Sequence, residues 1–222
     1  VLKPSLLLIL SWVCGWVLFP DGHAQAVSDQ VREALRDRIE AGRTGETLSA
    51  CSERIHATAA LSPFYEARGY RPAWTEARGP KNKALELMGA IGAAGDEGLD
   101  PEGYHFAAIS QNLERLRYGR GSDADPGILA DLELLLTDAF LIYAGHLLSG
   151  QVNPETIDSE WLANQREADL TRLFERALSD HHVEETLRGL LPVHSGYVML
   201  REALKTYRQI EGRGGWVKVS GG

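Results

Sequence analysis

The chain has 222 residues, which is enough for one ordinary domain or for one domain with an appendage. Hydrophobic residues make up 44% of the sequence and charged residues 24%, and this composition argues against general disorder and against a collagen-like repeat. The formal net charge of −8 argues against a nucleic-acid-binding surface, because such a surface needs a basic face. Two cysteines are too few for a disulfide scaffold or a cysteine-rich zinc site.

Residues 1–26 have the features of a secretory signal peptide. Lys3 is followed by an uncharged apolar run over residues 5–19, and small residues at positions 24–26 form an Ala-Gln-Ala cleavage pattern. A bilayer core about 30 Å thick needs ~20 helical residues, so this run is short for a retained membrane anchor, which is the alternative. We therefore expect cleavage after Ala26, a periplasmic location in a Gram-negative cell, and no membrane attachment after cleavage.

Residues 27–60 predict an N-terminal helical segment. Charged, helix-favouring residues occupy positions 28–41, and a second helix is expected over residues 46–60 because its apolar residues recur at intervals of three and four. Cys51 lies on the apolar face of that second helix. We interpret it as a small buried side chain; the alternatives are a nucleophile or an intermolecular disulfide.

Residues 61–216 predict an all-α fold, a single compact multi-helix domain around a long central helix. Ser62 and Pro63 suit the cap and first position of a short helix, and residues 70–74 are expected to be extended. The segment 128–149 is apolar almost all the way round, as a helix at the centre of a domain would be. The other expected helices cover residues 81–94, 106–118, 167–179, 182–190 and 195–211. Residues 217–222 are interpreted as the start of a truncated linker.

Few residues suggest chemistry. His181 and Glu185 are four positions apart and could face one metal ion, but no third ligand lies near them in the sequence. The acidic loop at residues 96–102 could supply a carboxylate pair for glycan hydrolysis, although Asp100 before a proline is also typical of a helix cap. His146 lies near the end of the expected central helix, where a cation would be favoured. The sequence therefore predicts no catalytic residue, no metal site and no cofactor.

Several strings in order resemble one family. They lie at residues 64–74, 98–105 (Gly-Leu-Asp-Pro-Glu-Gly-Tyr-His), 135–144, 148–154 and 190–216, and it is the five in order that are specific. Their order and spacing are similar to the non-catalytic scaffold domain of the large periplasmic L,D-transpeptidases. The resemblance implies that the chain supports a peptidoglycan-cross-linking enzyme. It also implies a catalytic domain and a peptidoglycan-binding module as partners, in cis or in trans, with peptidoglycan a candidate ligand.

The catalytic motif that the resemblance implies is missing from this chain. Members of the family use a cysteine in a Ser/Thr-x-Gly-Cys-x-Arg string, whereas Cys51 follows Ala50 and precedes Ser52. The chain is therefore expected to be either a fragment of a longer enzyme or the product of a gene without the catalytic part.

Two functions from different classes compete at this point. A scaffold would use aromatic residues as an interface or groove, and the candidates are Tyr70, Trp74, Tyr104 and Trp161, with core packing as the alternative for the tryptophans. A stand-alone peptidoglycan-modifying hydrolase would use the acidic loop at residues 96–102. A periplasmic binding or interaction protein is a third possibility.

Overall fold

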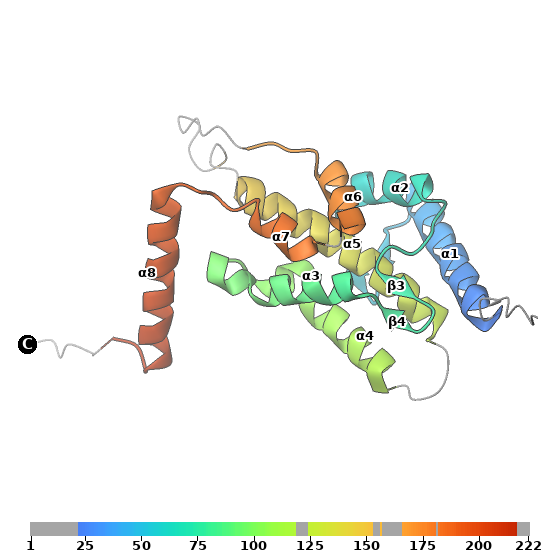
Figure 1. The fold of residues 1–222 in the computed structure, drawn as a ribbon, viewed down its shortest axis with the longest axis horizontal. Coiled ribbons are helices and arrows are strands. Elements are labelled where there is room, and N and C mark those ends of the chain that lie inside the picture. Colours follow the sequence, from blue (N-terminus) through green and yellow to red (C-terminus); the bar gives the residue numbers. More distant parts are fainter. Residues whose placement is uncertain (1–21, 119–123, 153–155, 157–165, 181, 217–222) are drawn as a thin grey trace, which may run out of the picture.

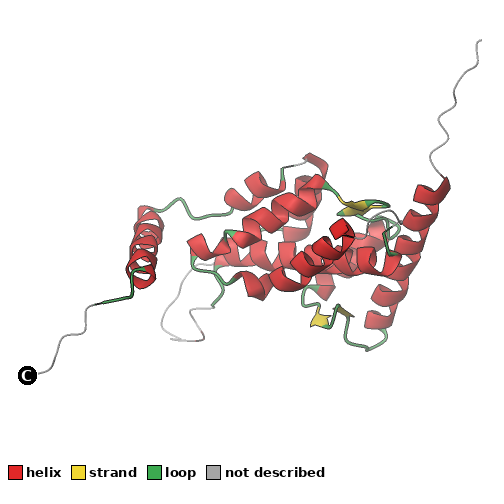
Figure 2. Cartoon of the chain, turned by 90° about the horizontal axis from the view of Figure 1, so that it is seen from below, coloured by secondary structure: helices red, strands yellow, loops and turns green. Residues whose placement is uncertain are grey.

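The computed structural model describes residues 22–118, 124–152, 156, 166–180 and 182–216. Within these ranges the chain is helical, with two short hairpins, which confirms the all-α prediction (Figures 1 and 2). The α-helices are α1 (Gly22–Arg43), α2 (Thr58–Ala67), α3 (Asn82–Gly92), α4 (Phe106–Tyr118), α5 (Pro126–Ser149), α6 (Leu170–Asp180), α7 (Val183–Arg188) and α8 (Ser195–Gly212). Two 3₁₀ turns, η1 (Ala94–Glu97) and η2 (Pro101–Tyr104), separate α3 from α4.

Helix α5 forms the centre of the fold, as its all-round apolar sequence predicts. It contacts α1, α2, α3, α4, α6 and both hairpins, and most of its side chains are buried. Asp125 caps its N-terminus by accepting a hydrogen bond from the Gly127 amide, and Pro126 follows at a position where a helix needs no N–H donor. Gly150, with a φ of 87°, ends the helix. The elements that pack around α5 form the body of the fold together with it, and they bury much of their surface against this helix.

The helix expected over residues 46–60 is wrong. The structure instead has an antiparallel hairpin of β1 (Ser49–Ala50) and β2 (Glu53–Arg54), and α2 begins only at Thr58. Cys51 and Ser52 form the turn with φ values of 51° and 67°, the left-handed pair that a type I′ hairpin requires. The spacing of apolar residues suited a helix equally well, so the sequence pattern could not distinguish the two.

The predicted start of the next helix at Ser62 is also wrong, because Pro63 lies inside α2. The free amide groups that precede α2 are bound by a side chain distant in the sequence. The backbone N–H groups of His56 and Ala57 both donate to Oδ1 of Asp138, at 2.9 and 2.6 Å. A helix N-terminus needs acceptors for its first N–H groups, and here α5 supplies one of them.

The segment expected to be extended at residues 70–74 has no regular secondary structure and leads into a second hairpin, β3 (Thr75–Glu76) and β4 (Gly79–Pro80). The helices expected at 81–94, 106–118, 128–149 and 195–211 are confirmed with small shifts of their ends. Residues 1–21, most of the expected signal peptide, and residues 217–222, the whole of the expected linker, lie outside the described residues. None of the described helices combines the length and the apolarity needed to cross a membrane.

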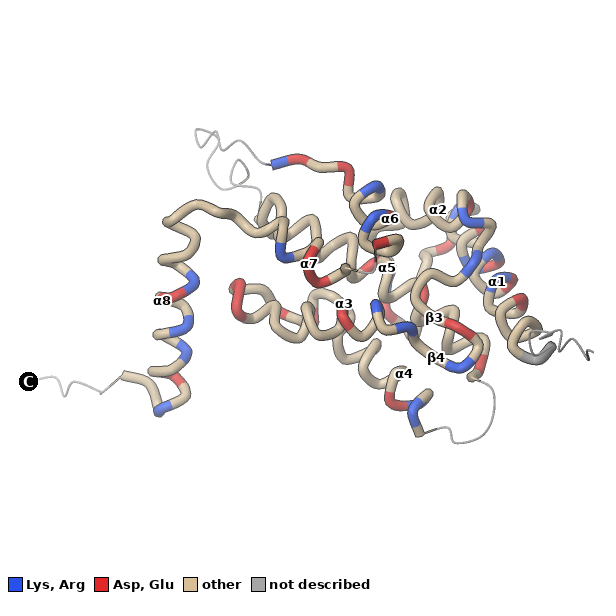
Figure 3. The backbone as a smooth tube through the Cα atoms, viewed as in Figure 1, with Lys and Arg blue, Asp and Glu red and all other residues tan. Residues whose placement is uncertain are grey.

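Helix α8 stands apart from the body in both views, joined to it by the segment that follows α7 (Figures 1 and 2). None of its residues is buried, and its main neighbour is η1. The charged residues of α8 begin only at Arg201, and those of α1 only at Asp29, so both helices start with an uncharged stretch (Figure 3). The position of α8 is therefore set by a few contacts at one end of the body.

Candidate functional site

Three carboxylates on α5 hold the irregular segments of the chain against the central helix. Asp131, Glu133 and Asp138 lie on this otherwise apolar helix, and the last two have no exposed surface. A buried carboxylate is stable only where donors surround it. Each of the three contacts a different segment that precedes α5 in the chain.

Glu133 binds the segment before β3. Its Oε1 accepts the amide N–H of Trp74 at 2.8 Å and that of Thr75 at 2.6 Å, and its Oε2 accepts the amide of Ala73 at 2.6 Å and the hydroxyl of Tyr65 at 2.8 Å. The burial of Tyr65 and the negative charge of Glu133 raise the pKa of the Tyr65 hydroxyl well above its ordinary value, so it remains a donor. The carboxylate is thus fully engaged by structural donors.

Asp131 lies beside the only thiol in the described part of the chain. Cys51 Sγ donates to Oδ2 of Asp131 at 3.3 Å and accepts from Nδ2 of Asn112 at 3.1 Å, while Arg38 of α1 donates to Oδ1 of Asp131 at 2.7 Å. Burial and the charge of Asp131 raise the pKa of the Cys51 thiol. A nucleophilic cysteine needs the opposite, a thiolate stabilised by positive charge. These contacts give Cys51 a structural role in the hairpin turn.

Asp138 belongs to a cluster with His56 and His105. Nε2 of His105 lies 2.8 Å from Oδ2 of Asp138, and Nδ1 of His56 lies 3.5 Å from the same oxygen. The other ring nitrogen of His105 lies 3.4 Å from a carboxylate oxygen of Glu53 on β2. The two imidazoles stack with centroids 6.1 Å apart, and His105 is buried while His56 is largely exposed.

The backbone and the charges around His105 are unusual. Its φ of 58° is left-handed, a conformation uncommon outside glycine, and it ends the turn η2. Burial acts to lower the pKa of His105, but its contacts with Asp138 and Glu53 outweigh burial and raise that pKa above the ordinary value. The cluster joins residues 49 and 33 positions apart, so no spacing motif in the sequence could indicate it.

The aromatic residues proposed as an interface do not share a surface. Trp74 and Tyr104 are almost completely buried, and Nε1 of Trp74 donates to Thr137 at 2.9 Å. Their side chains therefore belong to the core, in agreement with the packing alternative for Trp74. Tyr70 is half-buried and has a φ of 59°. Trp161 lies outside the described residues.

The acidic loop is engaged in local structure. Asp100 caps η2 by accepting the amide of Glu102 at 3.0 Å, which confirms its interpretation as a cap. Glu97 accepts a hydrogen bond from Tyr197 and pairs with Arg201 at 2.9 Å, so it connects η1 to α8. These contacts give two of the loop's carboxylates structural partners and provide no paired arrangement for glycan hydrolysis.

His146 and His194 each have a local partner. His146 faces Tyr104, whose hydroxyl is 3.0 Å from Nδ1, and burial lowers the pKa of His146 in spite of the nearby helix end. His194 caps α8 by accepting the amide of Gly196. His181 lies outside the described residues, so its pairing with Glu185 as metal ligands stays untested.

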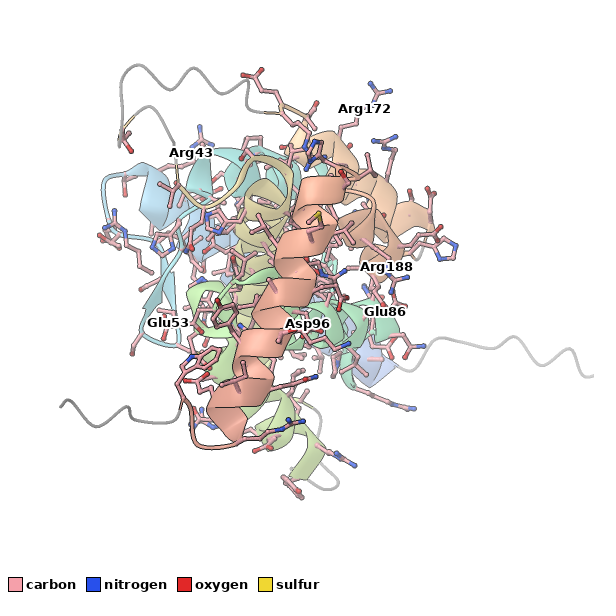
Figure 4. The ribbon with its side chains drawn as sticks, turned by 90° about the vertical axis from the view of Figure 1, so that its left-hand side faces the viewer. Arg43, Glu53, Glu86, Asp96, Arg172 and Arg188 are labelled. Atoms are coloured by element: carbon pink, nitrogen blue, oxygen red, sulfur yellow. The ribbon has the colours of Figure 1, made fainter. Side chains whose placement is uncertain are left out.

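Helix α8 has two different faces. The face toward the body combines charged and apolar residues, and we call it the mixed face. Arg201 pairs with Glu97, Arg208 donates to the carbonyl of Gly95, and Leu204 lies against Gly98. Figure 4 views the molecule from the end that α8 covers, with Asp96 of η1 beside it.

The second face of α8 is apolar and uncovered. Met199 and Leu200 are each 72% exposed and Tyr207 is 61% exposed, and these positions fall on one side of the helix together with Ala203. Trp216 is 70% exposed and packs edge-on against Tyr207, with ring centroids 6.1 Å apart. We refer to Met199, Leu200, Ala203, Tyr207 and Trp216 as the α8 apolar face. Residues of this kind gathered on one exposed surface usually mark an interaction site.

Comparison with known proteins identifies a family. A family model described as "Scaffold domain" matches residues 59–204, from the start of α2 to the middle of α8. The match covers well over half of the chain, including Glu133 with its contacts to residues 65–75 and the contact between His105 and Asp138, whereas His56 and Ala57 lie before it. No curated protein and no solved structure matches the chain.

Proposed function

Because the chain belongs to the family of L,D-transpeptidase scaffold domains, we propose that it positions the catalytic cysteine domain of a peptidoglycan-cross-linking enzyme. A scaffold role follows from the family. The cell-wall context and the periplasmic location are part of the proposal, and they are supported by the resemblance of residues 98–105 and by the signal-peptide pattern at residues 1–26.

The reaction that such an enzyme performs would take place on the partner domain. A cysteine thiolate there attacks the carbonyl of the L,D-peptide bond in a donor stem, and the terminal D-residue leaves as an amine. The side-chain amine of a neighbouring stem then attacks the thioester, so that the cross-link forms and the thiol is released. Cys51 is unsuited to the first step, since Asp131 and burial disfavour its thiolate. This chain would therefore supply position and support, and no reacting group.

The observation that carries the proposal is the uncovered α8 apolar face. An amphipathic helix normally buries its apolar side, yet α8 has no buried residue and directs its mixed face toward η1. The contacts of Arg201 and Tyr197 with Glu97 attach α8 to η1, which leaves the apolar face directed away from these contacts. We propose that the catalytic domain packs on this face.

The proposal can be tested by measuring binding to a separately produced catalytic domain of an L,D-transpeptidase of this family. Leu200→Asp places a charge on the α8 apolar face and should weaken binding at least about tenfold, because a buried unpaired charge is costly at an interface. Leu85→Asp is the matched control, since Leu85 is 51% exposed on α3, away from α8. Equal weakening by both variants, or none by Leu200→Asp, would contradict the proposed contact.

A second experiment tests the absence of catalysis in this chain. The purified chain is incubated with disaccharide-tetrapeptide muropeptides and the products are read by mass spectrometry. We expect neither cross-linked dimer nor cleaved stem from the chain alone. A sedimentation assay with intact sacculi would show whether the chain also binds the wall. Either muropeptide product would overturn the scaffold proposal in favour of an enzyme.

A further inference from the structure

The cluster of His56, His105 and Asp138 has the composition of a metal site. Two imidazoles and one carboxylate are ligands that Zn²⁺ and related first-row ions accept, and three protein ligands with one open position form a common zinc arrangement. The three ligand atoms lie within 4.8 Å of one another. They come from the segment after β2, from the end of η2 and from α5.

The distances from Asp138 to the two histidines suit a tetrahedral ion. Bonds of about 2.0–2.1 Å place neighbouring ligand atoms roughly 3.3 Å apart. Oδ2 of Asp138 lies 2.8 Å from Nε2 of His105 and 3.5 Å from Nδ1 of His56, on either side of that value. The His56 side chain is 58% exposed and can therefore adjust its position, whereas the other two ligands are held by packing.

The surroundings of the cluster resemble the outer shell of a metal site. A histidine ligand usually presents its second ring nitrogen to a carboxylate, which orients the ring, and Nδ1 of His105 lies 3.4 Å from Glu53. The second oxygen of Asp138 is fixed by the amide groups of His56 and Ala57. The left-handed φ of His105 is a backbone conformation of the kind that clusters at functional sites.

A route for an ion is also present. His56 lines a surface cleft of about 600 Å³ between α1 and the start of α2, bordered by Arg43, Leu48 and Pro63. The cluster is thus reached from solvent through the exposed His56 side, while His105 and Asp138 form its buried base.

From this geometry we propose that His56, His105 and Asp138 bind one divalent transition-metal ion, with Zn²⁺ as the probe. The ion takes the place of the proton shared between Nε2 of His105 and Oδ2 of Asp138, and water completes its coordination. It ties the β1–β2 hairpin and the end of η2 to α5, and so stabilises the body. This site is independent of the proposed contact on α8.

The test uses the purified chain without a histidine tag, freed of metal by chelation. Zn²⁺ is added in competition with a chromophoric chelator, and the melting temperature is recorded with and without one equivalent of Zn²⁺. We expect one ion per chain and a higher melting temperature with zinc. His56→Ala should weaken zinc binding at least about tenfold and abolish the thermal shift, since loss of even an outer-shell partner costs 10–100-fold in known sites.

Two further variants keep the test decisive. Glu53→Gln changes an exposed outer-shell carboxylate without disturbing the core and should weaken zinc binding by about tenfold. His182→Ala is the matched control, because His182 is an exposed histidine on α7 that lies 3.9 Å from Glu185, outside the cluster. The absence of one-to-one binding, unchanged affinity in His56→Ala, or an equal loss in His182→Ala would each overturn the site.

Discussion

The backbone amide of Trp74 lies 2.8 Å from Oε1 of Glu133, a carboxylate without exposed surface in the middle of α5. The same carboxylate accepts four further donors, the amides of Ala73 and Thr75 and the hydroxyls of Thr75 and Tyr65, so one side chain satisfies several donors of this irregular segment. Such an arrangement is stable only as a unit, because each donor would otherwise be buried without a partner. Glu133 is therefore the residue whose loss should damage the body most.

Glu133→Ala should lower the free energy of unfolding by at least about 3 kcal/mol. Each buried donor left without an acceptor costs about 1–3 kcal/mol, and the amide groups of residues 73–75 all lose theirs, while the Tyr65 hydroxyl keeps the carbonyl of residue 133 and the Thr137 hydroxyl as partners. Urea unfolding followed by circular dichroism measures the change. Glu175→Ala, at an exposed position on α6, is the control and should change stability by less than about 0.5 kcal/mol.

Trp74→Ala should lower the free energy of unfolding by about 3–5 kcal/mol, the usual cost of removing a large aromatic side chain from a core. Trp74 packs against Phe140 and Phe174, with ring centroids 6.3 and 5.4 Å away, and has no exposed surface. Trp216→Ala is the matched comparison, since Trp216 is 70% exposed, and its unfolding curve should nearly overlay that of the unmodified chain. A similar loss in both variants would mean that α8 is packed more tightly than described.

Cys51 should react slowly with iodoacetamide at pH 8, compared with a free cysteine. Burial and Asp131 raise the pKa of its thiol, so the reactive thiolate is scarce. Asp131→Asn removes the negative charge, lowers that pKa and should increase the alkylation rate severalfold, measured by mass spectrometry on the Cys51 peptide.

A control separates this charge effect from a loosened structure. Arg38→Gln breaks the Arg38–Asp131 ion pair but leaves the negative charge beside the thiol. It should not accelerate alkylation of Cys51. An equal acceleration in Arg38→Gln and Asp131→Asn would show that exposure, and not charge, limits the reaction.

The pKa of His146 should lie below its ordinary value when measured by NMR titration, because burial disfavours the charged imidazole. Burial raises the pKa of Tyr104 to about 12, so its hydroxyl stays protonated and can donate to Nδ1 of the neutral His146 ring. Tyr104→Phe removes a contact that favours the neutral ring and should raise the His146 pKa. Tyr143→Phe removes a hydroxyl that donates instead to the carbonyl of Ala90, and should leave it unchanged.

The lowered pKa of His146 also predicts how this residue affects stability at different pH values. A histidine with a lowered pKa in the folded state binds more protons when the chain is unfolded, so stability rises with pH across this interval. The contribution of His146 is therefore complete above its ordinary pKa of about 6.5 and is lost as the pH falls through the lowered value. A His146→Gln variant should show a flatter melting temperature between pH 7 and pH 5, and an unchanged pH dependence would contradict the assignment.

The features that could be predicted correctly from the sequence are those that depend on neighbouring residues. The apolar run at 128–149 predicts the central helix, and Asp100 before a proline is typical of the cap that it forms on η2. These features depend on residues within a few positions of one another. The family resemblance rests on the order and spacing of five such strings, and the matched family model agrees with it.

Features that depend on contacts between α5 and segments earlier in the chain could be recognised only in the tertiary structure. The start of α2 is set by Asp138, 81 positions away from Ala57, and the turn at Cys51 is held by Asp131, 80 positions away. The same long-range contacts assemble His56, His105 and Asp138 and bury Trp74. A buried carboxylate binds whichever donors the fold brings to it, so its partners are decided by packing in three dimensions and leave no periodic trace in the sequence.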